Sequence, residues 1–332
     1  LGMGGVRAWR ELGYEPTAWH MNEGHSAFLT LERALSYVRE GKDFEQAKAL
    51  VKRNNVFTTH TPVPAGNDEF PLWLIDKYFV QIWPELGLSR DDFINIAQVK
   101  QSWGGDAFSM PILALKLSQF RNGVSELHGK VARQMWSFLW PDKKDEEVPI
   151  SHITNGVHTE TWLARRMGVL FSRYLGADWT EHIDDPGLWA QIENIPDEEF
   201  WRVRRHLKRK LVAYIISRGR EQWKTAGVHP VQTIASGVLL DPYALTIGFA
   251  RRFATYKRAN LILRDYDRLL KIVTDARMPV QFIFAGKAHP ADEPGKRMIQ
   301  DVYRAVKDAR FGGRLAFRED YDLNIARHMV QG

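Results

Sequence analysis

The sequence of 332 residues contains no cysteine, which excludes disulfide bonds and thiolate metal sites. A chain without cysteine suits a reducing compartment, and we expect a cytoplasmic location. No uninterrupted run approaches the roughly 18 apolar residues that a membrane-spanning helix needs, so we expect no membrane partner. The first residues, "LGMGGVRAWRELG", do not join a charged segment to an apolar core and therefore predict no signal peptide.

The chain also lacks a strong charge of one sign, since its formal net charge is +6 and its isoelectric point is near 9.4. No arginine- or lysine-rich arm and no nucleic-acid motif is present, and we expect no nucleic-acid partner. The mild excess permits an anionic substrate. Basic residues of a long amphipathic helix predicted at 197–225 are interpreted as a solvated face.

Internal repeats and low-complexity segments are missing, and the apolar segments predict an α/β protein. The first half reads as a strand at 16–21, a helix in "EGHSAFLTLERALSYVRE", and a strand in "NVFTTHTPVPAGNDEFP" that runs into a proline- and glycine-rich loop. Helices are expected at 109–119 and 122–140, then an exposed connection at 140–151 and a short strand at 152–157.

The last third is the most regular part of the sequence. Three apolar runs, at 244–250, 280–286 and 314–319, begin 36 and then 34 residues apart. Helical segments at 257–274 and 293–308 separate them, a spacing typical of βαβ units in a parallel sheet with helices on both faces. Such sheets bind ligands at the carboxyl ends of their strands, where all the motifs below are expected to lie.

The segment "RRFATYKR" places Arg251, Arg252, Lys257 and Arg258 after the first of these runs. We expect them on the strand–helix loop and the first helical turn, where the helix dipole disfavours cations by a few tenths to about 1 kcal/mol. A bound anion would reverse that disadvantage, because arginine forks and a lysine charge suit phosphate. The alternative is an exposed, solvated charge run.

Polar residues follow the other predicted strands as well. "FAGKAHP" holds Gly286 and Lys287, which fit a phosphate loop or an ordinary turn about equally. "HMNEGHSAF" places His20, Glu23 and His25 together, but their order does not match the zinc motif HExxH, and no metal site is predicted. The alternative there is a polar helix start.

Two further strand ends carry His60, in "TTHTPVPAGNDEF", and Asn155, in "ITNGV". Each is individually weak evidence, since a lone histidine is more often structural and Asn-Gly is first of all a turn signal. Together with glycine- and proline-rich loops and many aromatic residues, these groups suit a sugar. Adding the cation segment predicts a pocket for a sugar and a phosphate.

At this point the motifs resemble those of the α-glucan (glycogen, starch, maltodextrin) phosphorylases. The similar blocks occur in family order and are "WHMNEGHSAF", "VFTTHTPVPAGNDEFP", "NGVSELHGKVARQMW", "ITNGVHTETW", "RRFATYKR", "FAGKAHPADEPGK" and "FREDYDLNIARHMV". They cover the chain almost from end to end, and the wording "AGNDEFP" is more similar to the shorter bacterial and archaeal branch. The resemblance implies a glycosyltransferase of glycogen degradation that converts α-1,4-glucan and phosphate reversibly to glucose 1-phosphate, with retention.

The resemblance further implies a GT-B-like fold, in which two Rossmann-like domains face each other across a cleft. Residues 1–155 would be the C-terminal part of the glucan-side domain, and 156–332 the N-terminal part of the phosphate- and cofactor-side domain. Both domains would be incomplete in this chain. The implied partners are maltooligosaccharide and phosphate or glucose 1-phosphate, and a homo-oligomer is left open.

The resemblance assigns a role to individual residues of the cation segment, with pyridoxal phosphate as the implied cofactor. Arg252 and Lys257 would bind the substrate and cofactor phosphates, with Arg251 beside them. Tyr256 and Tyr321 would line the cofactor.

On the other side of the implied cleft, the resemblance assigns sugar contacts. His60 and Asn155 would contact the glucosyl unit, whereas Glu23 and His25 would lie on the sugar side.

One departure from the family pattern concerns the cofactor. The block similar to "EASGTSGMK", whose lysine binds pyridoxal phosphate covalently in the family, is not found before Gly332, and neither is the glycine-rich block expected ahead of residue 1. The hypothesis is that this chain is an internal fragment with little activity alone. Two rival functions stay open, a nucleotide-sugar-dependent α-glucan synthase of the same architecture and a non-catalytic glucan-binding module.

Overall fold

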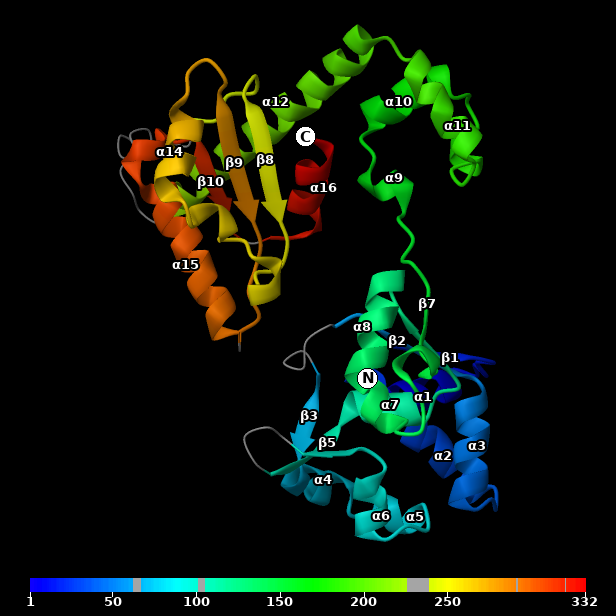
Figure 1. The fold of residues 1–332 in the computed structure, drawn as a ribbon. Helices are drawn as coiled ribbons and strands as arrows, with labels where there is room; N and C mark the ends of the chain where they lie inside the picture. Colours follow the sequence, from blue (N-terminus) through cyan, green and yellow to red (C-terminus); the bar gives the residue numbers. More distant parts are fainter. Residues whose placement is uncertain (62–66, 101–104, 226–238, 291, 320) are drawn as a thin grey trace. The chain divides into compact units, whose positions relative to one another are not determined.

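A computed structural model describes residues 1–332 except 62–66, 101–104, 226–238, 291 and 320. The fold is mixed α/β and divides into two compact units, Leu1–Val157 and His158–Gly332 (Figure 1). Each unit has its own parallel sheet and its own core, so each is described separately below.

The main sheet of the first unit has four parallel strands in the order β1–β2–β6–β7. These strands are β1 (Trp19–Asn22), β2 (Asn55–Thr59), β6 (Phe120–Gly123) and β7 (Ser151–His152). A second, antiparallel sheet is formed by β3 (Glu69–Pro71), β5 (Asp106–Ser109) and β4 (Gln98–Lys100).

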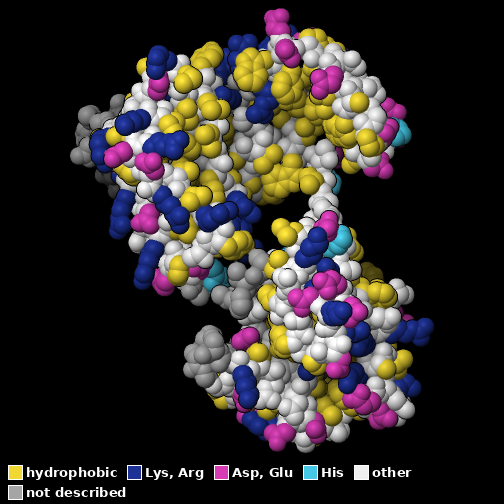
Figure 2. Space-filling view, viewed as in Figure 1, with side chains coloured by type: hydrophobic (Ala, Val, Ile, Leu, Met, Phe, Trp, Pro, Cys, Tyr) yellow, Lys and Arg dark blue, Asp and Glu magenta, His cyan; other side chains and the backbone are white. Residues whose placement is uncertain are grey.

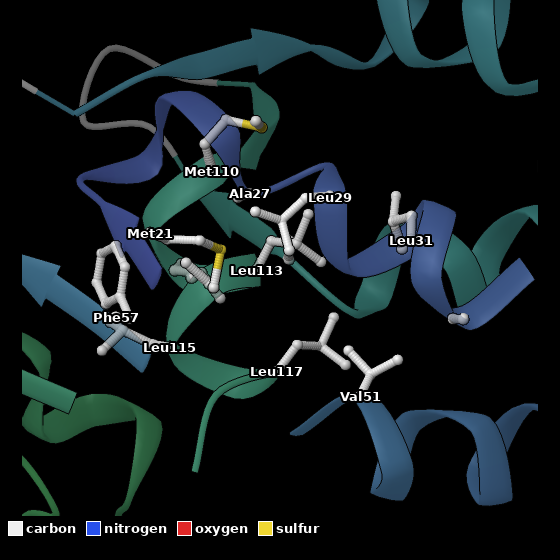
Figure 3. Packing of buried hydrophobic residues seen from close by; sticks show 14 of the residues in the cluster. Met21, Ala27, Leu29, Leu31, Val51, Phe57, Met110, Leu113, Leu115 and Leu117 are labelled. Carbon is white, nitrogen blue, oxygen red and sulfur yellow. The ribbon is translucent and has the colours of Figure 1, made fainter. Parts of the chain in front are cut away.

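The helices of the first unit pack around its two sheets. They are α1 (Gly2–Glu11), α2 (Leu29–Arg39), α3 (Phe44–Arg53), α4 (Leu72–Phe79), α5 (Ile82–Glu85), α6 (Arg90–Asn95), α7 (Met110–Lys116) and α8 (Glu126–Trp136). Figure 3 shows Met21 of β1 and Phe57 of β2 lying beside Leu113 and Leu115 of α7. All four side chains are fully buried, which places the core between neighbouring strands and α7.

Local sequence explains where α3 begins. Asp43 accepts a hydrogen bond from the backbone N–H of Gln46 at 2.8 Å, and the Gln46 side chain accepts one from the backbone N–H of Asp43 at 3.2 Å. This reciprocal capping box satisfies two amides that the first helical turn leaves without partners.

The second unit has a three-stranded parallel sheet in the order β10–β9–β8. The strands are β8 (Leu245–Ala250), β9 (Val280–Ala285) and β10 (Leu315–Arg318). The helices are α9 (Thr159–Trp162), α10 (Arg165–Tyr174), α11 (Pro186–Ala190), α12 (Asp197–Thr225), α14 (Tyr266–Thr274), α15 (Glu293–Lys307) and α16 (Leu323–Gln331).

Alternate residues of β9 bury opposite faces of this sheet. Phe282 and Phe284 pack in the cluster formed with α14 and α15, whereas Ile283 packs with Leu211 of α12. In Figure 1, α14 and α15 lie on one side of the sheet, and α12 and α16 lie on the other. The predicted parallel sheet with helices on both faces is therefore confirmed for this unit.

Other predicted elements need correction. The helix expected at 257–274 begins only at Tyr266, because Thr255–Lys257 and Leu261–Leu263 form short 3₁₀ turns. The helix expected at 122–140 overlaps β6, whose residues continue the sheet beside β2. Pairing with a buried neighbouring strand decides this segment, and a single-sequence pattern does not reveal that contact.

Two loops also differ from expectation. The segment after β2, read as a loop, contains β3, while 62–66 of that loop lie outside the described residues. The strand expected at 152–157 is limited to β7, and 153–157 are exposed. The long helix predicted at 197–225 matches α12. Across the described ranges, no helix is both long enough and apolar enough to cross a membrane.

The core of the first unit generates a stability prediction. Phe57→Ala removes a fully buried ring and should lower the free energy of unfolding by about 3–5 kcal/mol. Leu127→Ala is the control, because Leu127 is 73% exposed and its loss should change stability by less than about 0.5 kcal/mol. Urea unfolding followed by circular dichroism measures both, and equal effects would contradict the assignment of this core.

Candidate functional site

The parallel sheet of the first unit collects polar residues at one edge. Glu23 follows β1, His60 follows β2, and Asn155 lies three residues beyond β7. Because these strands are parallel, their carboxyl ends meet at the same edge of the sheet.

Glu23 is buried, and its backbone adopts the unusual φ of 64°. Its Oε1 accepts hydrogen bonds from the backbone N–H groups of His60, at 2.5 Å, and Thr61, at 2.8 Å. Its own N–H donates to the Thr58 carbonyl at 2.8 Å. Glu23 therefore fixes the turn that follows β2, a role that the sequence did not reveal.

The side chain of His60 stands beside this carboxylate and is 36% exposed. Its Nδ1 lies 3.6 Å from Glu23 Oε1, so the ring is oriented by the same group that holds its backbone. His25 points elsewhere, since its Nδ1 lies 2.5 Å from Oδ2 of Asp68 and its side chain is exposed. Asn155 is exposed, and its backbone N–H donates to the Val124 carbonyl at 3.2 Å.

Sequence reasoning missed a second group of polar side chains under this edge. His20 Nε2 lies 2.8 Å from Thr58 Oγ1, which donates to Asn122 Oδ1 at 3.0 Å. On α8, burial lowers the pKa of His128, although the charge of Glu23 acts in the opposite direction. His128 Nε2 is buried without a hydrogen-bond partner among the described residues. Two motifs marked this region beforehand, "HMNEGHSAF" with His20 and "NGVSELH" with Asn122 and His128, but neither indicated that these side chains lie together.

In the second unit, Arg251, Arg252 and Lys257 lie on the segment that leaves β8. This segment runs beside the one that leaves β9, because Arg251 N–H donates to the Ala285 carbonyl at 3.2 Å and Phe253 N–H to the Lys287 carbonyl at 2.8 Å. Phe253 is fully buried and anchors the segment in the core. The predicted strand-end position of these cations is thus observed.

The predicted relation of these cations to a helix dipole is wrong. Lys257 ends a 3₁₀ turn, and the following α-helix, α14, starts nine residues later at Tyr266. The electrostatic cost comes instead from burial and from neighbouring cations. Burial lowers the pKa of Lys257, and the charges of Arg251 and Arg252 lower it further. Its charged form therefore works against folding at neutral pH.

The aromatic residues of the predicted site join the same strand ends. Lys257 Nζ lies 5.5 Å from the centre of the Tyr256 ring, a cation–π distance. Tyr321 follows β10, and its hydroxyl donates to the carbonyl of Ala250, the last residue of β8, at 3.2 Å. The sheet therefore brings Tyr321 to the cation segment, although Tyr321 lies 69 positions after Arg252 in the sequence.

Gly286 allows the two segments to approach so closely. A Cβ atom at this position would lie 2.1 Å from the Arg251 carbonyl oxygen and 2.6 Å from the Phe253 ring. Lys287 follows it and is exposed. No group of three or more histidine, aspartate or glutamate residues within the described ranges is arranged to bind a metal ion.

Comparison with known proteins bears on this arrangement of strand-end residues. A family profile described as "Carbohydrate phosphorylase" matches residues 7–332. The chain belongs to the carbohydrate phosphorylase family. The resemblance inferred from the motifs is thereby confirmed, and both groups of strand-end residues lie within the matched range of this phosphorylase-family chain.

Individual relatives match the whole chain. It is 43% identical to "Maltodextrin phosphorylase" of Thermococcus litoralis and 39% identical to "Glycogen phosphorylase" of Aquifex aeolicus, covering 38% and 47% of these proteins. It is also 39% identical to "Glycogen phosphorylase" of Mycobacterium tuberculosis and covers 39% of it. The phosphorylase-family chain thus spans less than half the length of each of these relatives.

The role of Glu23 leads to a prediction. Glu23→Ala leaves two amides without their acceptor and should lower the free energy of unfolding by about 1–3 kcal/mol. Glu23→Gln keeps an acceptor oxygen and should lose less than half as much. Hydrogen exchange at the amides of His60 and Thr61 should accelerate in the alanine variant. Equal losses in the two variants would show that the carboxylate does not hold this turn.

Gly286 leads to a second prediction. Gly286→Ala forces a methyl group against the Arg251 carbonyl and should destabilise the chain by about 3 kcal/mol. Gly156→Ala is the matched control, because a Cβ there meets no atom within 4 Å. Thermal unfolding measures both variants, and an unchanged melting temperature for Gly286→Ala would contradict the close approach of these segments.

Proposed function

We propose that the protein containing this chain transfers glucosyl units from α-1,4-glucan ends to phosphate, with retention, and forms glucose 1-phosphate. The supporting observation is the cation cluster at the strand ends, in which neighbouring positive charges and burial lower the pKa of Lys257. A dianion would offset this unfavourable charge. The named relatives support maltodextrin or glycogen as the glucan.

In this proposal the two units belong to a GT-B-like architecture. The first unit would be part of the glucan-side domain and the second part of the phosphate-side domain, facing each other across a cleft. Their parallel sheets with polar carboxyl ends support this assignment. The domain boundary at 155/156 and a cytoplasmic location stay predictions.

In the proposed reaction, the substrate phosphate and the phosphate of the implied cofactor, pyridoxal phosphate, would lie close together. Two unit charges about 4 Å apart repel by roughly 4 kcal/mol at an effective dielectric constant near 20. Arg252 and Lys257 would offset that repulsion as fixed cations, with Arg251 beside them, and a developing charge stabilised in this way lowers the reaction barrier. The guanidinium supplies paired N–H donors, and the ammonium supplies a compact charge.

The residues present also fit the phosphate end of pyridoxal phosphate, the cofactor that the family implies. The cations lie beside two tyrosines, Tyr256 and Tyr321. Among the described residues, no carboxylate lies within hydrogen-bonding distance of Arg251, Arg252 or Lys257, so their charge is not balanced. When bound, this cofactor supplies a phosphate group for acid–base exchange with the substrate phosphate. Lys257, Tyr256 and Tyr321 would hold and orient that group.

On the glucan side, His60 and Asn155 would contact the glucosyl unit and His25 would lie at the margin of the sugar site. Glu23 is proposed to act through His60, because its carboxylate is occupied by backbone N–H groups. The His60 ring is partly exposed, and its Nδ1 lies next to the Glu23 carboxylate. This position would orient the ring for a contact with a sugar hydroxyl.

The test is phosphate-dependent release of glucose 1-phosphate from maltodextrin by the natural polypeptide that contains this chain. Lys257→Met should lower turnover by at least about 100-fold, because a charge aimed at the reacting phosphates contributes several kcal/mol. Its melting temperature should be unchanged or higher, since the Lys257 charge is unfavourable in the folded protein. Lys271→Met, an exposed cation on α14, is the control and should keep full activity.

Three outcomes would contradict the proposal. Consumption of ADP-glucose or UDP-glucose without phosphate dependence would indicate the synthase. Calorimetric binding of maltooligosaccharide that is indifferent to phosphate and to Arg252→Ala would indicate a glucan-binding module. A loss of activity in Lys257→Met that is accompanied by a lower melting temperature would indicate a structural role for that lysine.

A further inference from the structure

A second positively charged site lies in the groove between α10 and α12, away from the strand-end cations in sequence. Four arginines, Arg165, Arg166, Arg173 and Arg202, line this groove together with one carboxylate, Glu199. Its volume is about 490 Å³, which is the size of a small-molecule site. In the space-filling view, Lys and Arg side chains gather over α12 (Figure 2).

The charges in this groove are not balanced. Arg173 Nη1 pairs with Glu199 Oε2 at 2.9 Å, which accounts for the one carboxylate of the lining. Arg165, Arg166 and Arg202 have no hydrogen-bond or ion-pair partner among the described residues. The groove therefore presents three guanidinium groups whose donors are available to a ligand.

Cations on the neighbouring face of α12 differ, because they are used to hold the fold. Arg204 donates to the carbonyl oxygens of Gln331, at 3.0 Å, and Gly332, at 3.3 Å. Lys208 donates to the Ala244 carbonyl at 2.9 Å. A structural role thus accounts for these two residues but not for the three free arginines of the groove.

The first turn of α10, which carries Arg165 and Arg166, is an unfavourable position for positive charge. Arg165 and Arg166 occupy the first turn of α10, which contains no acidic residue, and its N-cap residue, Ala164, offers no capping side chain. The dipole of the helix disfavours cations here and favours an anion.

Part of the groove lining is apolar. Val169 and Leu170 of α10 and Val203 of α12 line it, and Leu170 is buried in the core that joins these helices. Arg165, Arg166 and Arg202 are exposed, so their guanidinium groups can donate charge-assisted hydrogen bonds to phosphate oxygens of a ligand.

We propose that this groove binds a small anion with two or more adjacent phosphate groups, such as a phosphoanhydride. Three arginine forks match several phosphate oxygens, and one monovalent anion would leave most of the charge unbalanced. The groove is formed by α10 and α12, and none of the strand-end residues assigned to phosphorolysis lines it. Interpreting the basic residues of α12 only as a solvated face, as the sequence suggested, overlooks this arrangement.

Isothermal titration calorimetry with inorganic tripolyphosphate tests the proposal on the 332-residue chain. The double variant Arg166→Gln/Arg202→Gln should weaken binding at least about tenfold, since two charge-assisted hydrogen-bond donors are lost. Arg209→Gln/Lys210→Gln is the matched control on α12, with the same loss of charge outside the groove lining. It should weaken binding less than threefold. The same order should hold in an Arg252→Gln/Lys257→Gln background, which removes the strand-end cations as a second site for the anion.

Several results would overturn the proposal. Equal weakening in the groove and control variants would show unspecific attraction to a basic surface. Loss that follows the Arg252/Lys257 variant would place the anion at the strand-end site. Tighter binding of an oligo-aspartate peptide than of tripolyphosphate would indicate an acidic protein partner. If the glutamine variant fails to fold, Arg166→Lys/Arg202→Lys keeps the charge but removes the forks, and unchanged affinity there would also contradict the site.

Discussion

Parallel pairing of short strands is the constraint on which both units depend. A parallel pair needs a crossover connection, and helices in these connections cover the sheets. The carboxyl ends of all strands in one sheet then lie at one edge. In the first unit this edge carries Glu23 and His60, and in the second it carries Arg251 and Tyr321. The candidate residues come together because of this pairing.

The two edges are stabilised in different ways. In the first unit a buried carboxylate binds backbone amides, so the polar groups satisfy one another within the protein. In the second unit the cations have no such partner, and both burial and mutual repulsion act on Lys257. The first edge is therefore preorganised, whereas the positive charge of the second would be offset by the anion proposed to bind there. This difference fits a division between a sugar side and a phosphate side.

The groove between α10 and α12 extends the same electrostatic reasoning to a helical surface. Arginines that donate hydrogen bonds to backbone carbonyl groups, such as Arg204, stabilise the fold. Arginines without an acceptor among the described residues, such as Arg202, can bind a ligand. Counting cations in the sequence does not separate these classes, because the acceptors come from distant parts of the chain.

The family and part of the second unit could be predicted from the sequence alone. Apolar runs with 34- to 36-residue spacing predicted β8, β9 and β10, and helical periodicity predicted α12 and α15, since these patterns are local. Blocks such as "RRFATYKR" predicted the carbohydrate phosphorylase family. Only the tertiary structure showed that 120–123 form a strand and that Glu23 holds the turn at His60. Each of these depends on a contact between residues far apart in the chain, and a local pattern contains no information about such a contact.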